Sequence, residues 1–175
     1  MRQRINIIGA TYCIFFSILS WCGSSPAATV AADDVQANPG DTGVNVSVTL
    51  YPKSWEQVCS AQFDVVFDSA ALSNSGIAIG SAAYAADKDI VWNVLAVNRV
   101  RVLIAGMNQN AIAEGVLADL SFNVSYTAAD GSHAVGLEGV LLSNRYGDAI
   151  TSVALAGSIM IATEGEGEGE GEGEG

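Results

Sequence analysis

The residues that could support catalysis are few and scattered in this 175-residue sequence. The single histidine, His133, lies in the turn-like stretch ADGSHAV, close to Asp130 and Ser132. Ser, His and Asp that are neighbours in sequence do not make a catalytic triad, because the side chains of a triad must converge in space around the nucleophile. We therefore interpret His133 as a solvated turn residue.

Two acids, Glu114 and Glu138, are the candidates for glycosidase chemistry, which uses a pair of carboxylates on either side of a sugar-binding cleft. Each acid stands beside a glycine at an apparent strand entrance, in AEGV and LEGV, and no cluster of aromatic residues accompanies them. Solvated turn acids are the better interpretation. The sequence therefore predicts a protein that is not an enzyme.

Metal ions and cofactors are not expected. A zinc site needs about four nitrogen or sulfur ligands, and the sequence offers one histidine and three cysteines, two of them close to the N-terminus. Asp87 and Asp89, in ADKD, could supply oxygens to calcium, but the stretch lacks the dense oxygen spacing of an EF-hand loop. Cys59 precedes a strand-like run and is interpreted as a small buried hydrophobic residue rather than a reactive thiol.

The N-terminal segment, residues 1–32, has the composition of a secretory signal peptide with a short leader. Arg2 and Arg4 precede an apolar run, and small residues follow, so cleavage is expected after Ala27 or Ala32. The segment includes Cys13 and Cys22, so a secreted product would have no partner for a disulfide within one chain. A retained membrane anchor is the alternative, because the apolar run is near the lower length limit for spanning a bilayer.

The C-terminal segment, residues 163–175, is an alternation of Glu and Gly that ends in EGEGEGEGEGEG. Low hydrophobicity and like charge predict a disordered, extended linker or tail, and the sequence leaves open whether more of a larger protein follows. Between the two ends, residues 33–162 are predicted to form one domain. The net charge of -12 disfavours nucleic acid and anionic lipid as partners.

The central domain is predicted to be all-β. In VNVSVTL (44–50) apolar and polar residues alternate strictly, as in a strand with one buried face. The same period is found in SAQFDVVF, RVRVLIA and ADLSFNVSY, and we expect Trp92 and Tyr126 to face the core with the other apolar positions. Weaker runs lie near residues 30–35, 72–79, 90–94, 134–142 and 152–161. About nine short strands, with at most one helical turn near Ala70 and Ala71, predict a β-sandwich of jelly-roll or Greek-key topology.

Five stretches occur in an order and spacing that resemble a cohesin domain, between residues 35 and 161. They are ANPGDTGVNVSVTL, AQFDVVFDSAALS, EGVLADLSFNV, LEGVLLSNRYGDAI and AGSIMI. The resemblance implies a nine-stranded jelly-roll sandwich that performs no chemistry. It also implies a secreted or cell-surface module that recruits a dockerin-like protein during extracellular polysaccharide breakdown.

The resemblance also implies which residues would contact such a partner. The outward residues of two strands form the recognition face in this interpretation, namely Ser60, Gln62, Asp64, Arg101 and Leu103. Well-studied cohesins place Asn and Asp where Ser60 and Gln62 stand, and an acid at the position of Gly106. These differences put binding to a standard dockerin in question.

Two other functions agree with the sequence. The sandwich could be a carbohydrate-binding module in which Trp55, Tyr84 or Tyr146 stacks on a sugar ring. It could equally be a structural spacer in a surface protein, which the acidic and aromatic-poor composition would suit.

Overall fold

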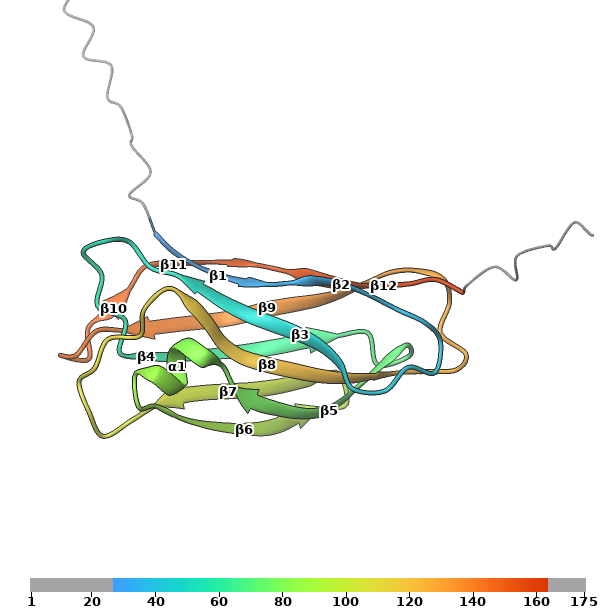
Figure 1. Cartoon of the computed structure of the whole chain (residues 1–175), viewed down its shortest axis with the longest axis horizontal. Coiled ribbons are helices and arrows are strands. Elements are labelled where there is room, and N and C mark those ends of the chain that lie inside the picture. The colour runs from blue at the N-terminus through green and yellow to red at the C-terminus, as the bar shows by residue number, and fades with distance from the viewer. Residues whose placement is uncertain (1–26, 164–175) are drawn as a thin grey trace, which may run out of the picture.

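The computed structural model describes residues 27–163 as a sandwich of two β-sheets with one short helix (Figure 1). The predicted signal peptide, apart from its last residues, and the Glu-Gly tail lie outside the described residues. The elements are β1 (Ala28–Ala32), β2 (Asp34–Ala37), β3 (Val44–Tyr51), β4 (Ser60–Phe67), β5 (Leu72–Ile79), α1 (Ser81–Ala85), β6 (Asp89–Ala96), β7 (Arg99–Ala105), β8 (Gly115–Val124), β9 (Gly131–Ser143), β10 (Ala149–Ile150), β11 (Ser152–Leu155) and β12 (Gly157–Ile161).

The two sheets divide the strands unequally. One sheet has the order β11-β1-β3-β8-β5, and the other has the order β2-β12-β9-β4-β7-β6, with β10 paired to β9. Neighbouring strands are antiparallel except at two places, where β1 pairs with β11 and β2 pairs with β12 in parallel. The all-β jelly-roll sandwich predicted from the sequence is therefore confirmed, with mixed sheets.

Between residues 27 and 163 the number of strands is twelve rather than the predicted nine. Two predicted strands, near 30–35 and 152–161, are each divided where the chain passes from one sheet to the other. Both passages lie side by side, and Gly157 is placed so close to the backbone of Asp33 that a Cβ on the glycine would overlap its carbonyl oxygen. The third additional strand is the two-residue β10, which is too short to produce a periodic pattern.

The domain also begins earlier than predicted. Ala28 and Val30 of β1 are completely buried, and β1 lies between β3 and β11. The boundary placed between residues 32 and 33 would therefore exclude a core strand, and the sandwich starts at Ala28.

The core between the sheets follows the predicted alternation on the central strands. The aromatic ring of Phe122 meets that of Phe67 edge to face, with 5.2 Å between centroids. Phe63, Leu50 and Ile104 are among the largest side chains that are fully buried with them. Cys59 is buried as predicted, with Sγ 3.5 Å from the carbonyl oxygens of Gln57 and Gln109.

Three local predictions are wrong. Trp92 lies on the core side of β6, opposite Val102, but is 41% exposed, because β6 is the edge strand of its sheet and is not fully covered by the facing sheet. Tyr126 is exposed because β8 ends at Val124. His133 belongs to β9, opposite Ile159, rather than to a turn.

A single turn is present at Ala70 and Ala71, where the backbone nitrogen of Leu72 donates to the carbonyl oxygen of Asp68 at 2.8 Å. The short helix at Ser81–Ala85 was not predicted from the sequence. In residues 27–163 no helix has the length and apolar character needed to cross a bilayer.

Candidate functional site

The five residues predicted to contact a partner lie on one surface, the outer side of β9, β4, β7 and β6. Directly paired residues of neighbouring strands carry their side chains on the same side of a sheet, so the register defines rows across this surface. One row runs Val91, Leu103, Gln62, Leu141, and the next runs Asn93, Arg101, Asp64, Glu138. We call these two rows, with Ser60 and Ser143 beside them, the four-strand face.

A bulge brings Glu138 and Leu141 onto this same surface. Their positions along the chain differ by three, and in a regular strand that spacing would put the two side chains on opposite sides of the sheet. The register of β9 against β4 shifts between Gln62 and Asp64, and Gly139 there has a φ of 56°, which favours glycine. The bulge is thus the reason that β9 adds two residues to the face.

The first row is largely apolar. Leu141 is 61% exposed and Leu103 is 43% exposed, and Val91 is exposed beyond them at the sheet edge. Leu103 and Leu141 also line a shallow depression of about 320 Å³ with Ser60 and Gln62, so three predicted residues share one hollow. Leu141 and Val91 were not among the residues predicted from the sequence.

The second row is an ion-pair cluster. The carboxylate of Asp64 accepts hydrogen bonds from Nε of Arg101 at 2.7 Å and from Nη2 of Arg101 at 3.0 Å. Nη1 of Arg99 lies 3.5 Å from the same carboxylate, and Arg99 also pairs with Glu138. Asp64 is only 4% exposed, so it faces outward as predicted but is covered by the arginines.

This arrangement makes Asp64 a residue that positions others. The hydrogen bonds from Arg101 hold the pKa of the Asp64 carboxyl below its ordinary value, the positive charges of Arg101 and Arg99 act in the same direction, and burial opposes them. The carboxylate therefore stays ionised and fixes the Arg101 guanidinium on the surface.

Gly106 lies at the end of β7, where the resemblance predicts an acid. A Cβ at this position would lie 2.9 Å from the carbonyl oxygen of Asp87 and 3.2 Å from Cδ of Lys88. The backbone of the loop after α1 occupies the space that a larger side chain would need. The departure from the family pattern is thus built into the packing of this loop.

The aromatic residues considered for sugar binding lie in two places. Trp55 and Tyr146 are exposed and line the same depression, of about 390 Å³, together with Glu56, Asn144 and Arg145. The guanidinium carbon of Arg145 lies 5.0 Å from the centre of the Tyr146 ring. Tyr84 lies apart, on α1 beside Lys88. We call the first of these the Trp55–Tyr146 depression.

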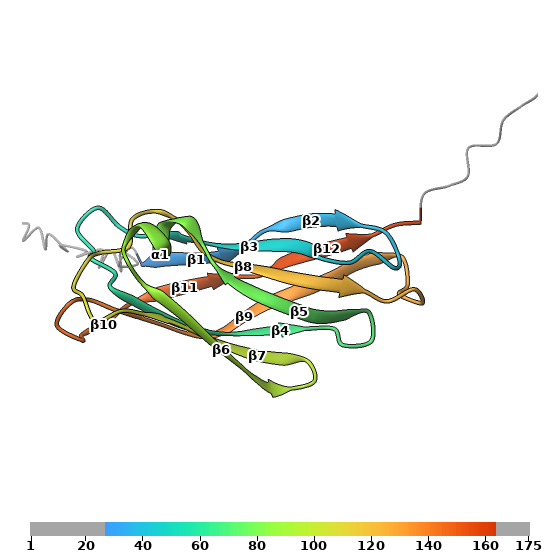
Figure 2. The ribbon, with the colours of Figure 1, turned by 60° about the horizontal axis from the view of Figure 1, so that its bottom comes forward.

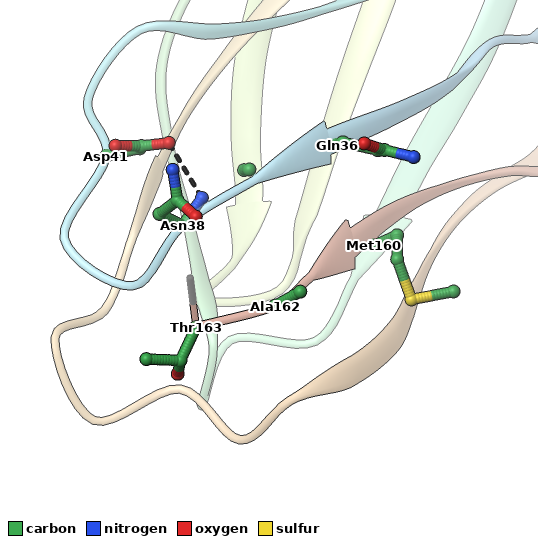
Figure 3. Close-up of a pocket in the computed structure, with 7 residues that line it drawn as sticks. Gln36, Asn38, Asp41, Met160, Ala162 and Thr163 are labelled. Carbon is green, nitrogen blue, oxygen red and sulfur yellow. Dashed lines mark hydrogen bonds between the residues drawn. The ribbon is translucent and has the colours of Figure 1, made fainter. Parts of the chain in front are cut away.

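The histidine weighed for catalysis is held by structural contacts. His133 has Nδ1 3.2 Å from Asp68 Oδ2 and Nε2 2.9 Å from the carbonyl oxygen of Ala129. Within residues 27–163 no cluster of three or more His, Cys, Asp or Glu side chains could hold a metal ion. A further hollow lies where β2 and β12 end, and in it Asp41 Oδ2 accepts a 2.7 Å hydrogen bond from the backbone nitrogen of Asn38 (Figure 3).

The ion-pair cluster predicts how stability depends on pH. Because the pKa of Asp64 is lower in the folded chain than the unfolded value of about 3.9, its stabilisation is complete above that pH. The stabilisation is lost as the pH falls through the folded-state pKa. We expect Asp64→Asn to lower the free energy of unfolding near neutral pH by about 1–2 kcal/mol and to reduce the loss on acidification.

Urea unfolding followed from neutral pH to about pH 3 measures this dependence. Asp89→Asn makes the same charge change on exposed β6, and among the described residues Asp89 has no ion pair. An acid-induced loss of stability that is equal in Asp64→Asn and in the parent chain would contradict the assigned role of Asp64.

The comparisons with known proteins agree with this architecture. The sixth cohesin of scaffoldin B from Acetivibrio cellulolyticus, solved in complex with a dockerin mutant, has a TM-score of 0.71 and 22% identity and covers 78% of this chain and 100% of that chain. The OlpA cohesin from Clostridium thermocellum, also solved with a dockerin, has a TM-score of 0.70 and 20% identity, with coverage of 78% and 100%.

A non-cellulosomal cohesin from the archaeon Archaeoglobus fulgidus has a TM-score of 0.67 and 22% identity, and the match covers 81% of this chain and 95% of that chain. No curated protein matches the sequence. At these identities the structures show the shared fold, whereas the family is shown by the sequence, since residues 28–161 match the model of the cohesin domain. The chain therefore belongs to the cohesin domain family.

Proposed function

We propose that this cohesin domain is a non-catalytic module that binds a dockerin-like protein on the four-strand face. Two of the matched cohesins were solved in complex with dockerins, which supports this class of partner. The observation that carries the proposal is the exposed apolar row on this face, beside an arginine held in place by a covered carboxylate. A partner of this kind would serve recruitment in extracellular polysaccharide breakdown or cell-surface assembly.

The face has the composition of a protein interface. Leu103 and Leu141 border its depression, and they would lose water on contact with an apolar side chain of the partner. Arg101 lies beside them, and arginine is enriched among the residues that dominate binding energy. Because Asp64 already fixes the guanidinium, little side-chain entropy would be lost when Arg101 meets an acceptor on the partner.

The charge of the face bears on which dockerins would fit. Arg99 and Arg101 are neutralised locally by Asp64 and Glu138. Ser60 and Gln62, which stand where well-studied cohesins carry Asn and Asp, offer a hydroxyl and a neutral amide. Recognition would therefore depend on apolar fit and on hydrogen bonds more than on net charge. We propose a partner that differs from a standard dockerin at the residues that would contact Ser60 and Gln62.

Replacing Leu103 or Leu141 by Asp tests the four-strand face. We expect each substitution to weaken binding of a cognate dockerin at least tenfold, since it puts an unpaired charge into the desolvated centre of the interface. Titration calorimetry against dockerins encoded in the same genome measures the affinity. Leu155→Asp is the matched control, because Leu155 is 51% exposed on β11, in the other sheet.

Thermal unfolding should show that all three variants remain folded. If Leu155→Asp lowers the affinity as much as Leu141→Asp does, the partner does not bind on the four-strand face. If no dockerin binds the parent chain, the proposed function itself is wrong.

Direct carbohydrate binding is a second candidate function, favoured by the Trp55–Tyr146 depression. Two exposed aromatic rings border one hollow with Arg145, Glu56 and Asn144, and such a set can stack on a sugar ring and bond its hydroxyls. The hollow is formed by the loop before β4 and the turn after β9, separate from the two rows of the four-strand face. If neither surface binds a ligand, the remaining candidate function is that of a structural spacer.

Affinity electrophoresis in gels that contain soluble cellulose, xylan or chitin derivatives tests the sugar site. We expect the parent chain to be retarded and the retardation to fall severalfold in Trp55→Ala and in Tyr146→Ala, because each loses a stacking surface. Tyr84→Ala removes an equally exposed aromatic ring elsewhere and should migrate as the parent does. Absence of retardation in every gel would exclude this function.

We also propose that the chain is secreted and that its signal peptide is removed after Ala27. Cleavage after Ala32, the other site that the small residues allow, would delete β1, remove the buried side chains of Ala28 and Val30 from the core, and leave the edge of β3 unpaired. The intact mass of the protein from the culture medium should correspond to a chain that begins at Ala28. A stable product that begins at Asp33, or retention in the membrane fraction, would contradict this proposal.

A further inference from the structure

His133 lies at one end of the core, between two links that carry the chain from sheet to sheet. Residues 68–71 connect β4 with β5, and residues 125–130 connect β8 with β9. Figure 2 shows both links at the end of the sandwich where β12 ends. His133 pairs with Ile159, which is completely buried, so the imidazole points to the core side of the sheet. Its side chain is only 13% exposed.

Both nitrogens of this imidazole face hydrogen-bond acceptors. Nδ1 lies 3.2 Å from Oδ2 of Asp68, in the link after β4, and Nε2 lies 2.9 Å from the carbonyl oxygen of Ala129, in the link before β9. A neutral imidazole has one N–H donor and one bare nitrogen, whereas an imidazolium donates from both nitrogens. Only the protonated ring can therefore bond both links at once. The neutral ring sets a lone pair against one of the two oxygens.

Asp68 is the charged group that the structure places against the ring. The backbone nitrogen of Ala70 donates to Oδ1 of Asp68 at 2.9 Å, and this bond, followed by the contact with His133, holds the pKa of the Asp68 carboxyl below its ordinary value. The carboxylate is therefore fully charged at about pH 6.5, where an ordinary imidazole titrates. From the other side, β12 presents the uncharged Ile159.

The link before β9 also holds the residue at which the described C-terminus is reached. Oδ1 of Asp130 accepts hydrogen bonds from the backbone nitrogen of Thr163 at 3.2 Å and from its hydroxyl at 3.0 Å. The carboxylate of Asp130 is thus bonded to Thr163, while the carbonyl of the preceding residue, Ala129, is bonded to His133. Whatever fixes this link also fixes the place where the chain leaves the sandwich.

We propose that protonation of His133 closes a clamp at this end of the sandwich. The protonated ring ties Asp68 to Ala129, and it thereby fixes the link in which Asp130 holds Thr163. The neutral ring keeps one of the two bonds and releases the other link. An imidazole in an unfolded chain titrates at about pH 6.5, so the clamp stabilises the fold fully below that pH and the stabilisation is lost as the pH rises. This property goes beyond partner binding and does not depend on it.

Hydrogen exchange of backbone amides tests the clamp. His133 is the single histidine of the chain, so it is the side chain expected to change charge in the neutral range. The amides of Ala128 and Thr163 are hydrogen-bonded in and to the link. We expect their protection to fall about fivefold between about pH 5.5 and about pH 8. The amide of Gly147, bonded in the turn after β9 at the opposite end, is the internal control and should keep its protection.

Two variants separate a clamp from a histidine that only fills space. In Asp68→Asn the new amide nitrogen can donate to Nδ1 of a neutral ring while Nε2 donates to Ala129, and the amide oxygen can still accept from Ala70. The clamp should then stay closed at both pH values. In His133→Gln the side chain cannot be protonated, so protection of the link should be the same at both pH values. Asp68 is 48% exposed, so Asp68→Asn is expected to fold even if His133→Gln does not.

Equal protection of Ala128 and Thr163 at the two pH values in the parent chain would overturn the proposal. A fall that persists in His133→Gln would show that another group is responsible. A fall in Asp68→Asn as large as in the parent chain would overturn the assigned role of the Asp68 carboxylate.

Discussion

The packing of two sheets against one apolar core determines which side chains this protein can offer to a partner. Phe63 of β4 and Val102 of β7 are directly paired and completely buried, so their neighbours Gln62 and Leu103 must point outward. A shift of either strand by one residue would expose the core residues and bury Arg101. The packing of the core beneath the four-strand face therefore determines how its two rows are aligned.

Within that constraint, local departures from regular strand geometry adjust the surface. The bulge at Gly139 turns both Glu138 and Leu141 outward, so β9 contributes an acid to the ion-pair cluster and a leucine to the apolar row. The covered carboxylate of Asp64 on β4 then orients Arg101 on the neighbouring strand β7. The face owes its apolar row to the register of the sheet and its ordered charges to a short network of hydrogen bonds.

The sequence predicts the features of the fold that depend on local alternation. It does not predict the features that depend on contacts between residues far apart in the chain. Period two predicted that Ser60, Gln62 and Asp64 point outward on one strand, and Arg101 and Leu103 on another, because these strands are regular and central. That the two strands share one surface was implied by the resemblance to a cohesin domain. The same period does not predict the bulge that exposes Leu141. It predicted that Trp92 is buried in the core, because a local pattern does not show where the facing sheet ends. The proximity of Trp55 to Tyr146, far apart in the chain, likewise depends on the closed fold.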